Sequence, residues 1–149
     1  MAIDQIEREV VIEAPVDRVW SLVTEFAFGL PGGELAKHDL REGAVFVAQY
    51  PEVGRFPLRI EKIEPARALS YRWASAFPGE EPRAGNSTLI EFTLTRTGKS
   101  TRLHVVESGF ASLDAPDAIR NKAFDDNTSG WRKELDTLKQ RAETQLSRR

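Results

Sequence analysis

The sequence predicts an α+β fold in which a curved antiparallel sheet is covered by a long C-terminal helix. Two observations lead to this prediction. Five consecutive segments between residues 44 and 108 have the alternation of β-strands, and residues 127–143 have the length and apolar spacing of an amphipathic helix. A sheet with one apolar face must bury that face against another layer. The helix over 127–143 is the only predicted element long enough to do so.

The bulk properties of the chain are those of one globular domain. Its 149 residues fit a single domain, which we assign to residues 1–149. The 21 basic and 23 acidic residues give a net charge of -2. This charge gives no electrostatic reason to expect binding to nucleic acid or to an anionic membrane. The absence of cysteine excludes disulfides, thiol nucleophiles and thiolate metal sites.

No targeting or membrane segment is expected. The sequence contains no apolar run approaching the roughly 18 residues of a membrane span. The opening MAIDQIEREV has two acids and lacks the apolar stretch of a secretory signal. A cytoplasmic location is therefore expected.

The N-terminal part predicts a strand, a short helix and a long loop. Residues 6–14 alternate with period two and are rich in β-branched side chains, which favours a strand. Pro15 suits the first turn of a helix. The apolar residues that follow it have helical spacing: Val16, Val19, Trp20 and Val23. Residues 25–43 hold four glycines and a proline, so a long loop with at most one helical turn is expected there.

The remaining chain predicts a meander of strands and then helices. Alternating strand signals lie at 44–50, 55–63, 68–74, 87–96 and 101–108, separated by turn-like or polar segments. A short helix is expected from about Pro116, followed by the long helix over 127–143. The inward stripe of the long helix is Trp131, Leu135, Leu138 and Ala142.

The inward-facing side chains predict a cavity between the sheet and the terminal helix. The helical stripe is narrow and ends in the small Ala142, which favours empty space beneath it, although the aromatic side chains offer the alternative of a filled core. The expected cavity lining is Phe28, Phe46, Phe56, Leu58, Tyr71, Trp73, Phe92, Leu94, Leu103, Val105, Glu107, Trp131, Leu135 and Leu138.

Glu107 is the one acid in this inward set, because it continues the phase of Leu103 and Val105. One interpretation is a polar anchor for a ligand, or an acid/base group, with a pKa raised by desolvation. The other, preferred on the sequence alone, is that the strand has already ended and Glu107 is solvated or pairs with an arginine. A buried Tyr or Trp also needs a hydrogen-bond partner, and Glu107 is a plausible one.

No catalytic constellation is visible in the sequence. The two histidines, His38 and His104, are not at metal-ligand spacing, and both are expected on the surface. The glycine-rich segment at 29–33 does not lead from a strand into a helix, so it lacks the context of a phosphate-binding loop. We therefore predict no catalytic residue, no metal and no cofactor.

Seven segments occur in a recognisable order: EAPVDRVWSLV at 13–23, DLREG at 39–43, IEKIEP at 60–65, YRW at 71–73, GNSTLIEFTL at 85–94, ESGF at 107–110 and GWRKELDTLK at 130–139. Together they resemble the activator of heat-shock-protein-90 ATPase homologue-like family. That family belongs to the SRPBCC superfamily of START lipid-transfer domains, birch-pollen-allergen-like proteins and polyketide cyclases. The resemblance implies a helix-grip fold. Its antiparallel sheet has six or seven strands and wraps around the C-terminal helix, and short helices follow the first strand. Many such proteins have an internal cavity for apolar small molecules.

The resemblance leaves three functions open. The leading one is a START-like intracellular protein that binds a small hydrophobic or aromatic molecule. The second is a stress-related accessory of a chaperone, as in the eukaryotic namesake, whose additional N-terminal domain is not expected here. The third is an enzyme of the polyketide cyclase or aromatase type that uses Glu107 or Tyr71 for proton transfer.

The sequence departs from the family pattern at two places. Ala27-Phe28-Gly29 stands where relatives often have Trp-Phe-Gly, and Gly43-Ala44 stands where many have two glycines. The first change removes a bulky ring from the expected cavity mouth. Ligand preferences of relatives therefore do not transfer directly to this chain.

Overall fold

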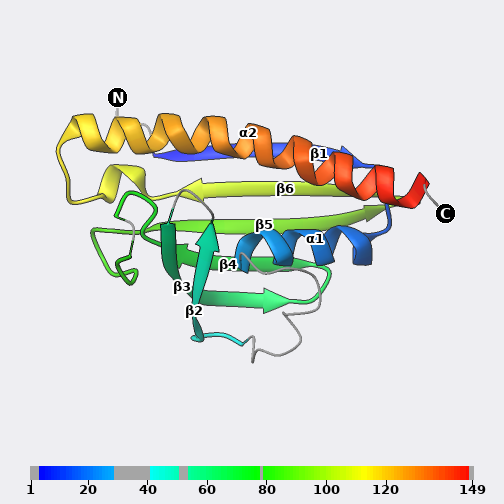
Figure 1. The fold of residues 1–149 in the computed structure, drawn as a ribbon, viewed down its shortest axis with the longest axis horizontal. Helices are drawn as coiled ribbons and strands as arrows, with labels where there is room; N and C mark the ends of the chain where they lie inside the picture. Colours follow the sequence, from blue (N-terminus) through cyan, green and yellow to red (C-terminus); the bar gives the residue numbers. More distant parts are fainter. Residues whose placement is uncertain (1–3, 29–40, 51–53, 78, 148–149) are drawn as a thin grey trace.

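A computed structural model describes residues 4–28, 41–50, 54–77 and 79–147 of the chain. It shows a six-stranded antiparallel sheet with a long C-terminal helix lying along it (Figure 1). The elements in order are β1 Gln5–Ile12, α1 Val16–Phe28, β2 Val45–Tyr50, β3 Gly54–Glu64, β4 Ala68–Trp73, β5 Thr88–Thr97, β6 Ser100–Ser108, the 3-10 turn η2 Phe110–Ser112 and α2 Asp117–Ser147.

The sheet has the strand order β1-β6-β5-β4-β3-β2. Strands β2 to β6 form a meander of neighbours in sequence, and β1 pairs with β6 at the far edge, from Gln5 opposite Ser108 to Ile12 opposite Thr101. The register of β3 against β4 shifts between Ile60 and Lys62, which marks a bulge. The predicted α+β class with an antiparallel sheet and a long C-terminal helix is confirmed, with six strands within the described residues.

Helix α1 is longer than the sequence predicted. It runs through Phe28, so the expected loop does not begin at residue 25. The added turn is stabilised by burial, because Ala27 is fully buried and Phe26 packs against the core. The rest of that expected loop up to residue 40, including His38, lies outside the described residues.

Helix α2 is one continuous helix, so the predicted division into a short helix and a long one is wrong. The predicted boundary fell before Asn127, in the polar run 125–129, whose residues each cost a helix up to about 0.7 kcal/mol relative to alanine, and Gly130 follows at a cost of about 1 kcal/mol. The cost does not break the helix here, since Ala123 before the glycine and Trp131 after it are both buried.

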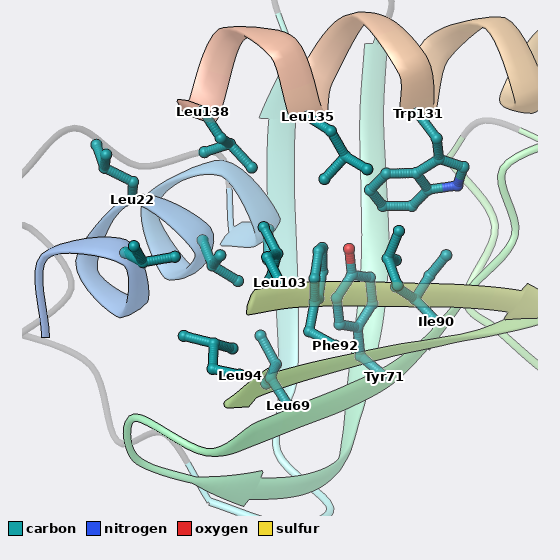
Figure 2. Close-up of a cluster of buried hydrophobic side chains, with 14 of the residues drawn as sticks. Leu22, Leu69, Tyr71, Ile90, Phe92, Leu94, Leu103, Trp131, Leu135 and Leu138 are labelled. Carbon is teal, nitrogen blue, oxygen red and sulfur yellow. The ribbon is translucent and has the colours of Figure 1, made fainter. Parts of the chain in front are cut away.

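The interior beneath the second half of α2 is filled with apolar side chains. Leu135 and Leu138 point down from the helix onto Leu103 and Phe92 of the sheet (Figure 2). The rings of Phe92 and Trp131 meet edge to face at 5.6 Å between centroids. The alternative of a filled core therefore describes this part of the molecule.

Polar contacts fix α2 over the neighbouring elements. Lys139 Nζ donates to the Val11 carbonyl at 2.8 Å, and the Glu13 amide donates to the Glu143 carboxylate at 2.8 Å. Arg141 pairs with Glu25 of α1 at 3.2 Å. These contacts tie the C-terminal half of the helix to β1 and α1, so the helix position is specified beyond its apolar stripe.

Candidate functional site

A pocket lies where the first half of α2 passes over β3, β4 and the end of α1. Its volume is about 450 Å³, within the roughly 300–1,000 Å³ of small-molecule sites in proteins. The residues that line it are Phe26, Phe56, Trp73, Ser75, Asp126, Asn127, Gly130, Trp131, Lys133 and Glu134.

The apolar part of the lining consists of two aromatic pairs. The sheet contributes Phe56 and Trp73, whose ring centroids are 5.5 Å apart. The helices contribute Phe26 and Trp131, which meet edge to face at 5.8 Å. Aromatic side chains offer large apolar contact area with few rotatable bonds. The pocket therefore has walls suited to a flat or apolar molecule.

Behind the two tryptophans lies the carboxylate of Glu107, which is fully buried on β6. It accepts hydrogen bonds from four side chains on three other elements or their flanks: Trp73 Nε1 at 3.1 Å, Thr88 Oγ1 at 2.6 Å, Trp131 Nε1 at 2.8 Å and Asn127 Nδ2 at 3.1 and 3.0 Å. The carboxylate thus joins β4, β5 and α2 at the base of the pocket.

None of these four partners carries a charge. Burial raises the pKa of the Glu107 carboxyl, while the hydrogen bonds from Thr88, Trp131, Trp73 and Asn127 act in the opposite direction. The interpretation that Glu107 is solvated or pairs with an arginine is therefore wrong. Strand β6 continues through Ser108, so Glu107 stays in the inward phase. The expectation that Glu107 serves as a partner for a buried Trp is confirmed.

Asn127 connects this buried group to the pocket. Its amide nitrogen donates to both Glu107 oxygens and also to the Ser75 hydroxyl at 3.0 Å. Ser75 follows β4 and lines the pocket together with Asn127. The polar end of the pocket is therefore held by a continuous chain of hydrogen bonds from the core.

The charged part of the lining is Asp126, Lys133 and Glu134. Asp126 pairs with Lys122 at 2.7 Å, one helical turn away. Partial burial raises the pKa of Glu134, and the nearby charges of Lys133 and Arg141 oppose the rise. Two carboxylates and one ammonium group therefore surround the aromatic walls.

The structure brings three of the predicted cavity residues to this pocket, namely Phe56, Trp73 and Trp131. Glu107 lies directly behind them. Eight others are buried in the core: Leu58, Tyr71, Phe92, Leu94, Leu103, Val105, Leu135 and Leu138. Phe46 packs against the core and is half-buried. Phe28 ends α1, and its side chain lies outside the described part. The ligand-binding role of all these residues stays a prediction.

Seven lining residues were missed from the sequence: Phe26, Ser75, Asp126, Asn127, Gly130, Lys133 and Glu134. Helical geometry offered a signal for two of them. Asn127 and Glu134 lie four residues before and three after Trp131, so they share its face of the helix. Phe26 was missed because residues 25–28 were assigned to a loop.

The remaining chemistry-bearing residues lie away from the pocket. His104 faces outward on β6, as expected, and its Nε2 lies 2.6 Å from a Glu7 carboxylate oxygen. In the described part of the chain, no group of three or more His, Asp or Glu side chains is placed to hold a metal ion. Among the described helices, none is long and apolar enough to cross a membrane.

An antiparallel sheet gripping a long helix, with a pocket beside that helix, defines a helix-grip domain. The chain belongs to the family of activator of Hsp90 ATPase homolog 1-like proteins, whose model matches residues 13–143. No curated protein matches the sequence.

Solved structures of similar fold include DynU16, from the dynemicin biosynthetic locus, with a TM-score of 0.70 and 24% identity over 96% of this chain and 48% of DynU16. The chain thus spans about half the length of DynU16. Protein MLL2253 of Mesorhizobium loti has a TM-score of 0.66 and 22% identity, over 91% of this chain and 94% of its own. The Aha1 dimer of Colwellia psychrerythraea has a TM-score of 0.65 and 17% identity, over 95% of this chain and 97% of its own. At these identities the likeness shows the fold.

Proposed function

We propose that the protein binds a small hydrophobic or aromatic molecule in the pocket between α2 and strands β3 and β4. The observation that carries the proposal is an aromatic-walled pocket of about 450 Å³ that opens beside the helix instead of being closed by it. Apolar walls supply affinity at about 25 cal/mol per Å² of buried apolar surface. Ser75 and Asn127 supply the few polar contacts that fix orientation.

Glu107 supports this function by holding the walls in place. It accepts a hydrogen bond from each pocket tryptophan, one on the sheet side and one on the helix side. Indoles fixed in this way lose little freedom when a ligand enters, which favours binding. The carboxylate itself is fully buried behind the indoles.

A thermal-shift panel of apolar and aromatic compounds tests the proposal. A ligand at about 100 times its Kd stabilises the native state by about 2.7 kcal/mol. The variant Gly130→Leu probes the site, because Gly130 lines the pocket and a Cβ there meets nothing within 4 Å. Leucine is also the better helix former, so the fold is expected to persist.

The matched control is Ser129→Leu, an exposed neighbour on the same helix that does not line the pocket. Ligand-induced shifts are expected to vanish in Gly130→Leu and to persist in Ser129→Leu. The proposal is contradicted if no compound of the panel changes the wild-type melting temperature, or if the ligand-induced shifts are equal in the two variants.

The family match gives grounds for a second candidate, association with an Hsp90-type chaperone. Pull-down and chaperone ATPase assays with the intact chain test it, and no complex at micromolar concentration would reject it. The cyclase alternative has less support. Within the described residues neither Glu107 nor Tyr71 lines the pocket, and both side chains are fully buried.

A further inference from the structure

We propose that the pocket selects aromatic ligands that carry a hydrogen-bond donor, a hydroxyl or an amino group, and that the acceptor is the side-chain oxygen of Asn127. This inference rests on the proposed ligand-binding function and specifies the ligand class. It follows from the orientation of one amide and from the charges around the pocket.

While Glu107 is ionised, the amide of Asn127 has only one orientation compatible with its surroundings. Its nitrogen lies 3.1 and 3.0 Å from the two oxygens of Glu107. It also lies 3.0 Å from the hydroxyl of Ser75. Turning the amide over would place its oxygen against the carboxylate, where two acceptors would face each other without a proton. Glu107 therefore determines which end of Asn127 remains available.

The end that remains is the oxygen. No described residue donates a hydrogen bond to Asn127 Oδ1. Among the described residues, the buried side-chain atom that lacks a hydrogen-bond partner is a nitrogen of Arg18, so Asn127 Oδ1 is not a buried atom without a partner. The oxygen is therefore open to solvent, on a residue that lines the pocket. An acceptor that is already oriented pairs with an N–H or O–H of a ligand, and cannot pair with an ether or carbonyl oxygen.

The other polar groups do not reverse this preference. The Ser75 hydroxyl oxygen accepts a hydrogen bond from Asn127. Its proton can rotate and donate to an acceptor on a ligand, but the hydroxyl does not exclude a ligand that carries a donor. Asp126 and Glu134 place two carboxylates in the lining against the single ammonium of Lys133. An anionic ligand such as an aromatic carboxylate is therefore disfavoured.

Isothermal titration calorimetry with three naphthalene derivatives tests the inference. The probes are 2-naphthol, which has a donor, 2-methoxynaphthalene, which has only an acceptor, and 2-naphthoate, which is an anion. The Kd of 2-naphthol is expected to be about three- to tenfold lower than that of the methyl ether, as one net hydrogen bond implies. The naphthoate is expected to bind most weakly.

Variants locate the preference at the amide. Asn127→Ala removes the acceptor, so the ratio of the two neutral Kd values is expected to approach one. Glu107→Gln keeps the shape but no longer fixes the amide, because its own NH2 can donate to Asn127 Oδ1, so the ratio is also expected to fall. Ser129→Ala, an exposed change on the same helix outside the pocket lining, is the control and is expected to preserve the ratio.

The ratio of the two neutral Kd values distinguishes the loss of the oriented acceptor from general damage to the pocket. A loosened pocket weakens the binding of both neutral probes alike and leaves the ratio unchanged. Equal binding of 2-naphthol and its methyl ether by the wild type overturns this inference and leaves the proposed function standing. A wild-type preference that survives in Asn127→Ala also overturns it. Failure of every probe to bind overturns the proposed function and this inference together.

Discussion

The contribution to stability of the hydrogen bonds from the two pocket tryptophans to Glu107 can be measured by removing one indole N–H at a time. Trp73→Phe retains an aromatic ring at the pocket wall and deletes a donor that lies 3.1 Å from Glu107. The chain offers a matched control in Trp20→Phe. Trp20 is half-buried like Trp73, but its indole donates no hydrogen bond to any described residue.

The magnitude follows from the charge of the acceptor. A hydrogen bond to an ionised group contributes about 1.5–3 kcal/mol, against about 0.5–1.5 kcal/mol for a neutral pair. The loss from shrinking the ring is common to both variants. Trp73→Phe is therefore expected to lower the free energy of unfolding by about 1.5–3 kcal/mol more than Trp20→Phe does. Trp131→Phe is expected to cost at least as much, because its hydrogen bond is 2.8 Å long and the residue is only 4% exposed.

Urea unfolding followed by far-ultraviolet circular dichroism is the suitable assay, because tryptophan fluorescence changes with each variant. The measurement is made at neutral pH and repeated in acid. Protonation of Glu107 turns a charged acceptor into a neutral one, so the excess cost of Trp73→Phe is expected to shrink in acid. Equal costs for the two variants at neutral pH would refute the view that Glu107 is held as a carboxylate by the indoles.

Three further results are expected. Burial raises the pKa of Glu107 above its ordinary value of 4.5. In the pH window between 4.5 and that raised pKa, the folded protein therefore binds more protons than the unfolded chain. The wild-type free energy of unfolding should therefore fall as pH rises through it, more steeply than in Glu107→Gln, when both are titrated with urea. Gly109→Ala should cost about 1–3 kcal/mol in thermal unfolding, because φ is 102° there while the nearest atom to an added Cβ is 3.7 Å away. Leu138→Ala should cost about 2–5 kcal/mol in the same assay, whereas Ile119→Ala on the exposed face of α2 should cost under about 0.5 kcal/mol.

The layers of the fold could be predicted because they depend on local periodicity. Alternation in β5 places Ile90, Phe92 and Leu94 inward, and the structure buries all three. The stripe of α2 was likewise predicted, from Trp131 to Ala142. The continuity of α2 could not be predicted, since propensity penalises the polar run 125–129 as well as Gly130, and the compensating burial on either side depends on tertiary packing.

The position of the pocket could not be predicted either. The sequence predicted a cavity between the sheet and the helix, with a filled core as the alternative, and did not distinguish one part of the helix from another. In the structure Leu135 and Leu138 pack against Phe92 and Leu103 (Figure 2). Among the described residues, an opening lies toward the start of the helix. There Gly130 adds no side chain, and the lining also draws on Phe26 from the end of α1. Which stretch of an amphipathic helix meets a filled core depends on side chains from several distant strands, and periodicity carries no information about them.

Glu107 shows how fold and site are connected in this molecule. Burying a carboxylate without a cation costs stability, and an apolar side chain of similar size often serves a core at least as well. Here the cost is offset by four uncharged donors that come from residues 73, 88, 127 and 131. Three of the four, all but Thr88, also line the pocket. Because three of the donors that offset the cost also line the pocket, we attribute the burial of Glu107 to a role in orienting the pocket walls.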